Sequence, residues 1–185
     1  MVARLFMWLN TYRKVDPMRG VVLALMLLAF VQTGTSSQSP AAKMQFPEQG
    51  AIKFSFRVLE GWTTSNDDVN KTLVVRAPGE EGAIMVLTVI DDPKEQGSLQ
   101  DVARTALKVA NAEPYTREED ISLSGRVGKA FYSTARLGGI DFNLRMSVFK
   151  IATTYLSATE VTRPGKTEAQ RQQLASLGIA INAAQ

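Results

Sequence analysis

The chain has 185 residues, with 21 Lys and Arg, 18 Asp and Glu, a formal net charge of +3, and neither Cys nor His. The absence of these two residue types excludes disulfides, thiolate nucleophiles, and serine triads or zinc sites of the usual construction. Residues 1–39 hold four of the basic residues and one acid, which leaves 17 residues of each sign in the remainder. The remainder therefore has no cationic field for nucleic acid, and we expect no nucleic-acid partner.

Residues 1–39 predict a secretory signal peptide. Basic residues ending at Arg19 precede an unbroken apolar run over residues 21–31, and small polar residues follow it. A membrane-spanning helix needs about 20 apolar residues, so this shorter run favours a cleaved signal over a permanent anchor. We expect a periplasmic or secreted protein that keeps no stable membrane anchor after cleavage.

Two details of this leader stay open. Cleavage after the small residues 34–36 and cleavage nearer residues 41–42 both fit the pattern. A start at Met18, in place of Met1, would make residues 1–17 a mis-annotated N-terminal extension.

The rest of the chain predicts a linker over residues 40–50 and a single domain over residues 51–185. The linker is rich in Ser, Pro, Ala and Gly and has no sustained hydrophobic period. The domain is long enough for one hydrophobic core, too short for two ordinary domains, and free of internal repeats.

The first half of this domain predicts strands. Apolar and polar residues alternate over residues 52–58, which indicates a strand with one buried face. Residues 72–77 and 83–90 flank a turn sequence rich in Pro and Gly, so we expect them to pair as a hairpin. The second of these runs is almost entirely apolar, which predicts a central position in the sheet.

Ser98 predicts the N-cap of a helix, with Asp101 in its first turn. Apolar residues then recur at spacings of three and four, which places them on one helical face that we expect to lie on the sheet. This face comprises Leu99, Val102, Ala103, Ala106, Leu107 and Ala110.

The second half predicts further strands and a final helix. Gly138 and Gly139 accept the positive φ angles of a two-residue hairpin turn. Gly178 is placed to end a helix over residues 167–177. The expected strands cover Ile121 and Leu123, then residues 130–137, 140–149 and 151–161. The order strands, helix, strands, helix predicts an α+β fold, with an antiparallel β-sheet that carries two helices.

This order, together with four local strings, resembles the PsbP-like fold family, which includes the extrinsic PsbP protein of photosystem II, bacterial DcrB-like envelope proteins and a eukaryotic Ran-binding import factor. The resemblance covers residues 46–181, although Leu59 stands where many members have Pro. The strings are residues 54–62 (FSFRVLEGW), 98–103 (SLQDVA), 128–132 (GKAFY) and 155–159 (YLSAT).

The resemblance implies an accessory, scaffold or assembly protein that binds a partner. It carries no shared catalytic residues to this chain and implies no cofactor. DcrB-like proteins are commonly lipid-anchored, but this chain has no Cys to carry such an anchor, so we expect a form without one.

Several polar clusters invite other interpretations. The segment 125–130 resembles a phosphate-binding loop but fails on spacing, because Leu123 stands where the first Gly belongs and Ala130 where Ser or Thr binds magnesium. The oxygen-bearing residues Asn66, Asp67, Asp68 and Asn70 suit a hard cation, although their spacing departs from the calcium-binding loop and a solvated turn is the preferred interpretation.

The other acidic clusters are Asp91 with Asp92 and the run 118–120. Acids in a row point in different directions along a strand, so adjacency alone does not make an acid–base pair. A cation or acid–base site would form only if the fold brought Asp91 or Asp92 close to Glu118.

Trp62 is the candidate partner-binding residue, because large aromatic rings are common in binding hot spots; the alternative is a core residue at the strand corner, which is the preferred interpretation. We therefore expect an exported, non-enzymatic accessory domain that binds another envelope protein. A small-ligand or divalent-cation binding protein that uses the acidic loops is the alternative, and a carboxylate-based hydrolase is the least favoured.

Overall fold

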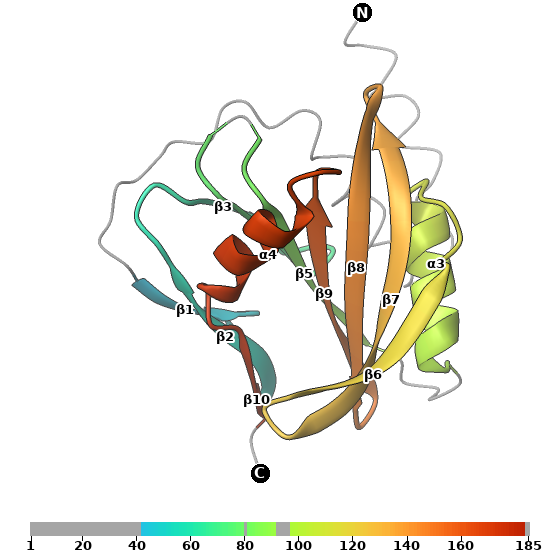
Figure 1. Ribbon diagram of the computed structural model, residues 1–185. Coiled ribbons are helices and arrows are strands. Elements are labelled where there is room, and N and C mark those ends of the chain that lie inside the picture. Colours follow the sequence, from blue (N-terminus) through green and yellow to red (C-terminus); the bar gives the residue numbers. More distant parts are fainter. Residues whose placement is uncertain (1–41, 80, 92–96, 184–185) are drawn as a thin grey trace, which may run out of the picture.

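The computed structural model describes residues 42–79, 81–91 and 97–183, so the predicted signal peptide and Met18 lie outside the described residues. Two antiparallel sheets and two helices make up this part of the chain (Figure 1). None of the helices described is long and apolar enough to cross a membrane.

The larger sheet has seven strands in the order β3-β4-β5-β9-β8-β7-β6, all paired antiparallel. Its central strands are long and mostly buried, and β6 and β3 form its edges. The strands are β3 (Thr63–Asp67), β4 (Thr72–Arg76), β5 (Ile84–Asp91), β6 (Arg117–Leu123), β7 (Arg126–Leu137), β8 (Ile140–Ile151) and β9 (Thr154–Thr162).

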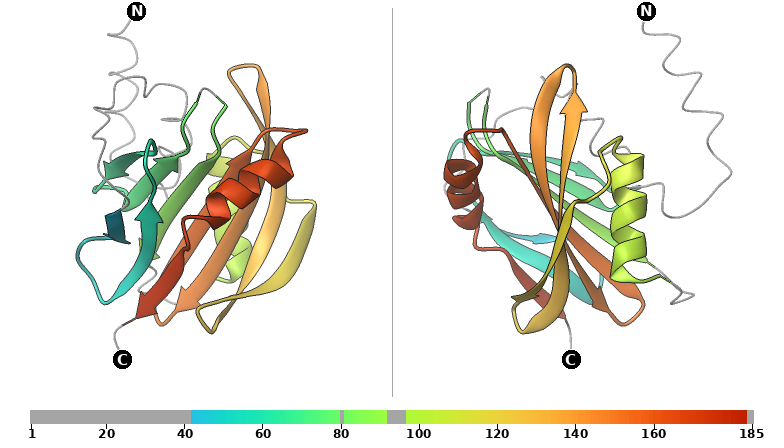
Figure 2. Two further views of the ribbon diagram at one scale, coloured as in Figure 1. Left: turned by 60° about the vertical axis from the view of Figure 1, so that its left-hand side comes forward. Right: turned by 45° about the vertical axis from the view of Figure 1, so that its right-hand side comes forward.

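The smaller sheet has three strands, β1 (Ala42–Phe46), β2 (Ile52–Val58) and β10 (Ala180–Ala183), in the order β1-β2-β10. It packs together with α4 (Thr167–Ala175) on one face of the larger sheet, whereas α3 (Leu99–Val109) covers the opposite face (Figure 2). The sheet therefore has an α3 face and an α4 face.

Each face of the larger sheet buries its own hydrophobic cluster, because side chains alternate along a strand. On β8, Leu144, Met146 and Val148 join the cluster under α3, and Phe149 joins the cluster under α4. The alternation predicted for β8 is confirmed, and so is the α+β class.

The helix predicted after Ser98 is confirmed. The Ser98 Oγ accepts a hydrogen bond from the backbone N–H of Asp101 at 3.1 Å, and the Asp101 carboxylate accepts one from the backbone N–H of Ser98 at 3.2 Å. These reciprocal bonds are a capping box, which satisfies two donors left free at a helix start. Val102, Ala103, Ala106 and Leu107 are buried against the sheet as predicted.

Both hairpin predictions are confirmed. Gly138 and Gly139 have φ angles of 59° and 82° and join β7 to β8, with Leu137 opposite Ile140. β4 and β5 pair across the predicted Pro-Gly turn, from Arg76 opposite Ile84 to Thr72 opposite Thr88. The final helix ends at Ala175, two residues earlier than predicted, and Gly178 follows with a φ of 57°.

The predicted linker over residues 40–50 is wrong for Ala42–Phe46, which form β1. This strand pairs with β2 from Ala42 opposite Val58 to Phe46 opposite Phe54, and Phe46 is buried. The burial of Phe46 outweighs the turn-forming composition around it. Two further strands were not predicted from the sequence: β3, which is short and mostly exposed, and the short strand β10.

Candidate functional site

A groove of about 410 Å³ lies on the α4 face, between α4 and the edge strand β6. Apolar side chains form its two walls, Ile121 and Leu123 from β6 and Leu174 from α4. Ser147 of β8 and Ala158 of β9 form part of its floor.

The strand register explains why the floor is hollow. Ser147 lies directly opposite Ala158, so two small side chains occupy one row across the sheet. In the next row, Phe149 lies opposite Leu156 and fills the space toward the smaller sheet. The groove is thus a row of small residues bordered on one side by a large aromatic ring.

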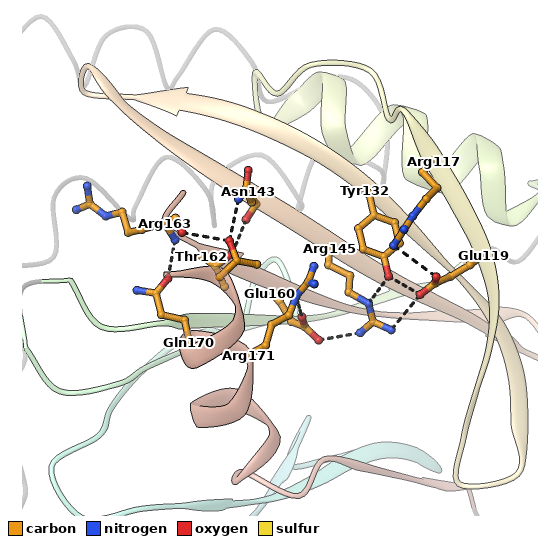
Figure 3. A network of polar contacts seen from close by, with 11 residues as sticks. Arg117, Glu119, Tyr132, Asn143, Arg145, Glu160, Thr162, Arg163, Gln170 and Arg171 are labelled. Atoms are coloured by element: carbon orange, nitrogen blue, oxygen red, sulfur yellow. Dashed lines mark hydrogen bonds and ion pairs between the residues drawn. The ribbon is translucent and has the colours of Figure 1, made fainter. Parts of the chain in front are cut away.

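A polar network closes the other side of the groove, one row away from Ser147 (Figure 3). The Arg145 Nη1 donates to Glu160 Oε1 at 2.8 Å, and the Arg145 Nε donates to the Tyr132 hydroxyl oxygen at 3.1 Å. The Tyr132 hydroxyl in turn donates to the Glu119 carboxylate. These residues come from four adjacent strands, β6 to β9, which fix their positions.

Two further arginines join this network. Arg171 of α4 places Nε 3.2 Å from Glu160 Oε2, and Arg117 of β6 places Nη2 3.5 Å from Glu119 Oε2. The Arg117 guanidinium carbon also lies 3.8 Å from the centroid of the Tyr132 ring, which is cation–π geometry. Three arginines therefore face two carboxylates, so the network carries one surplus positive charge.

The electrostatic environment favours the charged forms of Glu119 and Arg145. The pKa of Glu119 is lowered, first because the Tyr132 hydroxyl donates to it and then because Arg117 and Arg145 lie nearby. Burial of Arg145 opposes its charged form, but the hydrogen bond to Tyr132 and the attraction of Glu160 together hold the pKa of Arg145 above its ordinary value. Glu119 and Arg145 are therefore charged at neutral pH.

Some N–H donors of these arginines form no hydrogen bond within the described part of the chain. Within the described part of the chain, the two Nη groups of Arg171 have no hydrogen-bond partner, and Arg145 Nη2 has only an ion pair with Glu119 at 3.7 Å. The buried atoms Arg171 Nε and Glu160 Oε2 are close but not aligned for a hydrogen bond. The guanidinium end of the groove can thus bind an additional anion.

Gln170 positions α4 and therefore Arg171. Its buried amide accepts a hydrogen bond from the Arg163 backbone N–H at 2.5 Å and donates to the Glu81 carbonyl at 2.6 Å. Asn143 of β8 donates to the Thr167 hydroxyl at 2.8 Å, which secures the first turn of the helix. The start of α4 is thus tied to three separate segments.

The oxygen-bearing residues predicted as a cation loop occupy the end of β3 and the following turn. Amide groups of this turn already bond to the carboxylates: Asn70 Nδ2 donates to Asp67 at 2.6 Å, and Asn66 Nδ2 donates to Asp68 at 2.6 Å. Across residues 42–79, 81–91 and 97–183, no cluster of three or more acids could hold a metal ion. The cation hypothesis for Asn66, Asp67, Asp68 and Asn70 stays a prediction.

The described acids of the other two clusters have separate partners. Asp91 forms an ion pair with Lys71, whereas Glu118 and Asp120 both pair with Lys129, at 3.2 and 2.8 Å. Glu119 turns to the opposite face of β6, as expected for neighbouring residues on a strand. Asp92 lies outside the described residues.

Trp62 follows β2 in a tight turn, where its backbone N–H donates to the Leu59 carbonyl at 3.1 Å. Its side chain is half-buried and packs against the hydrophobic cluster of the α4 face. Trp62 is therefore a corner residue that packs against the core, and part of its ring is exposed. Its role in partner binding stays a prediction.

Sequence reasoning missed Arg145, Glu160 and Arg171. The sequence offered one signal, since Arg145 and Glu160 are charged residues inside otherwise buried strand patterns. Charged residues are rarely buried unless paired, so such positions indicate a polar network. The partner of each charge depends on strand register, which the sequence alone does not give.

No family model and no curated protein matches this chain. Among solved structures, the chain is similar to cyanobacterial PsbP (CyanoP) from Synechocystis sp. PCC 6803, with a TM-score of 0.56 and 13% identity over 84% of this chain and 99% of that one. It is also similar to LpqN, described as involved in cell envelope biogenesis of Mycobacterium tuberculosis, with a TM-score of 0.54 and 9% identity over 78% of this chain and 92% of that one.

These similarities confirm the fold expected from the sequence. The chain has the PsbP-like fold, with the α+β architecture and two helices predicted above. At such low identity the likeness concerns the fold alone, so function has to be argued from the groove and its charges.

Proposed function

We propose that this chain is an exported, non-enzymatic accessory domain that binds another protein of the cell envelope, and that the groove between α4 and β6 is the binding surface. The observation that carries this proposal is the groove itself. It combines apolar walls with a guanidinium end at which the two Nη groups of Arg171 donate no hydrogen bond within the described chain. Such a combination of an apolar surface and a few oriented polar groups is typical of a binding site.

Three other observations support the proposal. The signal-like leader favours export. The Tyr132 hydroxyl and the nearby Arg117 and Arg145 lower the pKa of Glu119, which suits binding better than proton transfer near neutral pH. LpqN, which has a similar fold, is described as involved in cell envelope biogenesis.

Affinity capture after cross-linking tests the proposal. The whole sequence is expressed with a C-terminal tag in its source cells, and partners from the envelope fraction are identified by mass spectrometry. Ala175 is exposed and lines the groove, so Ala175→Trp should fill it without disturbing the core. We expect one reproducible partner that Ala175→Trp loses.

Arg104→Gln provides the matched control, because Arg104 is an exposed arginine of α3, on the opposite face of the sheet. This variant should capture the same partner as the natural chain. Trp62→Ala tests whether Trp62, at the corner after β2, also contributes to partner binding. An identical set of proteins from the natural chain and from Ala175→Trp would argue against the groove as the binding surface.

A further inference from the structure

The groove is bounded at both ends. Just beyond Leu123, in the turn that follows β6, the Ser124 hydroxyl accepts a hydrogen bond from the Ile181 backbone N–H at 3.0 Å, which joins this turn to β10. The arginine network lies at the other end (Figure 3), and the sheet forms the floor between the two. A bound chain therefore cannot run through the groove along β6. It has to enter from the solvent side, between α4 and β6.

The hollow in the floor is one residue row long. Ser147 and Ala158 are paired in this row, and both are small. Phe149, two residues further along β8, is 1% exposed and packs in the hydrophobic cluster of the α4 face, so the hollow ends there. Arg145 lies two residues in the other direction, about 6.8 Å along the strand. The hollow therefore accommodates one apolar side chain directly beside the arginines.

The arginine end suits a carboxylate. Arg171 reaches from α4 across the network, with its guanidinium carbon 5.6 Å from the centroid of the Tyr132 ring. Two N–H groups of a guanidinium match the two oxygens of one carboxylate, and the Nη groups of Arg171 donate no hydrogen bond within the described residues. Three arginines face Glu119 and Glu160, so one further carboxylate would balance the charge of the network.

The short distance between the arginines and the hollow indicates where this carboxylate comes from. An Asp or Glu side chain followed by a separate aliphatic residue would bring additional peptide N–H and C=O groups into the groove, where they would lose water. In a C-terminal residue the carboxylate and the side chain share one Cα, so only one backbone N–H enters with them. A long acyl chain would exceed a hollow of one row. The geometry therefore favours the end of a protein chain.

We propose that the groove binds the C-terminus of its protein partner, with the terminal carboxylate at Arg171 and an aliphatic last side chain over Ser147 and Ala158. Leu174 of α4 and Ile121 of β6 would flank this side chain. The inference rests on the proposed function and identifies the partner's chemistry.

The acids beside the groove already have partners. Glu160 accepts from Arg145 through Oε1 at 2.8 Å, and its Oε2 is buried 3.2 Å from Arg171 Nε. Glu119 accepts from the Tyr132 hydroxyl and pairs with Arg145. The arginine end thus remains attractive to an incoming carboxylate.

NMR titration of ¹⁵N-labelled protein, purified from cells that express the whole sequence, tests this inference. The probe is an acetylated hexapeptide of Gly and Ser that ends in Leu with a free carboxylate. We expect saturable binding that shifts the backbone amide signals of Ser147 and Ala158. The same peptide with a C-terminal amide should bind about tenfold or more weakly, because the charge-assisted hydrogen bonds are lost. Gly in place of the terminal Leu should also weaken binding about tenfold or more.

Variants of the protein locate the binding. Arg171→Gln should bind the free-acid peptide no more tightly than the amidated peptide. Arg171→Lys keeps the charge but loses the paired donors, so it should retain part of the preference for the free acid. Ala175→Trp should abolish binding, and Arg104→Gln, on the opposite face of the sheet, should have no effect. Circular dichroism verifies that each variant is folded.

Straight-chain carboxylic acids distinguish a chain end from a lipid. Because the hollow is one row long, affinity should not rise from hexanoate to dodecanoate. Burial of each additional CH₂ group in a longer groove would instead raise the affinity roughly fourfold.

Four outcomes would overturn the inference. They are the absence of binding by the free-acid peptide, equal binding of the free-acid and amidated peptides, an affinity for straight-chain acids that rises up to dodecanoate, and concentration-dependent dimerisation that Ala175→Trp abolishes, measured by sedimentation. A captured envelope partner that Ala175→Trp loses, with no peptide bound, would leave the proposed function standing and refute only the recognition of a C-terminus.

Discussion

Arg145 and Glu160 lie opposite each other on β8 and β9, with Arg145 Nη1 2.8 Å from Glu160 Oε1. Their side chains are only 24% and 16% exposed, so solvent screens this pair weakly. Removal of one partner from such a pair leaves a charge with poor solvation. We expect Arg145→Leu to lower the free energy of unfolding by about 2 kcal/mol, measured by urea denaturation, after allowance for partial exposure.

The pair formed by Arg136 and Asp141 is the control, because both side chains are mostly exposed and the closest atoms lie 3.6 Å apart. Arg136→Leu should change the free energy of unfolding by less than about 0.5 kcal/mol. The double variant Arg145→Leu/Glu160→Leu should lose less stability than the sum of its two single variants. Additive losses would contradict a direct interaction within the pair.

The hydrogen bond from Tyr132 to Glu119 predicts a pH-dependent effect. The lowered pKa of Glu119 means that the folded state favours its carboxylate, so this stabilisation is present at neutral pH and is lost as the pH falls through the folded-state pKa. Tyr132→Phe removes the largest cause of the shift. Its Glu119 should titrate at higher pH, measured by ¹³C NMR of the side-chain carboxyl.

The stability difference between Tyr132→Phe and the natural chain should accordingly narrow as the pH falls below the folded-state pKa of Glu119. Tyr115→Phe is a suitable control, because Tyr115 packs near Phe131 on the α3 face and does not contact Glu119. An unchanged Glu119 titration in Tyr132→Phe would exclude the hydrogen bond as the cause.

The sequence predicted those parts of the fold that local patterns determine. The Ser98 cap, the Gly138-Gly139 turn and the alternation of β8 each depend on residues close together in the chain. β1 was missed because its pairing depends on Phe46 meeting Phe54 in the core, across a turn whose composition is typical of a linker. The strand conformation of β1 therefore depends on long-range pairing, which local composition does not reveal.

The groove could not be predicted from the sequence for the same reason, because its residues meet only through long-range contacts. Arg145 and Glu160 come from neighbouring strands, but Arg171 reaches them only because Gln170 and Leu174 fix α4 on this face. Each of these charges alone is consistent with an exposed residue. Only the register and the helix position reveal that they form one network.

The capping box at the start of α3 predicts a moderate stability loss. Ser98→Ala removes the hydroxyl that accepts from the Asp101 backbone N–H, and should lower the free energy of unfolding by about 1 kcal/mol. Ser98→Asp should restore most of the loss, because Asp also caps helices. Thermal denaturation followed by circular dichroism measures both, and a Ser98→Ala variant as stable as the natural chain would show that the cap is dispensable.

Gly128 determines how closely β7 packs against β8, and with it the position of the Phe149 ring beside the groove. A Cβ atom at Gly128 would lie 2.5 Å from Phe149 Cδ1 and closer still to the carbonyl oxygen of Val148, so the strand or the ring has to move. Gly128→Ala should therefore cost about 2–3 kcal/mol of unfolding free energy in urea denaturation, as overpacking of a filled core does. Val127→Thr should have little effect, because Val127 is 77% exposed. Equal stability of Gly128→Ala and the natural chain would mean that β7 and Phe149 do not pack as closely as described.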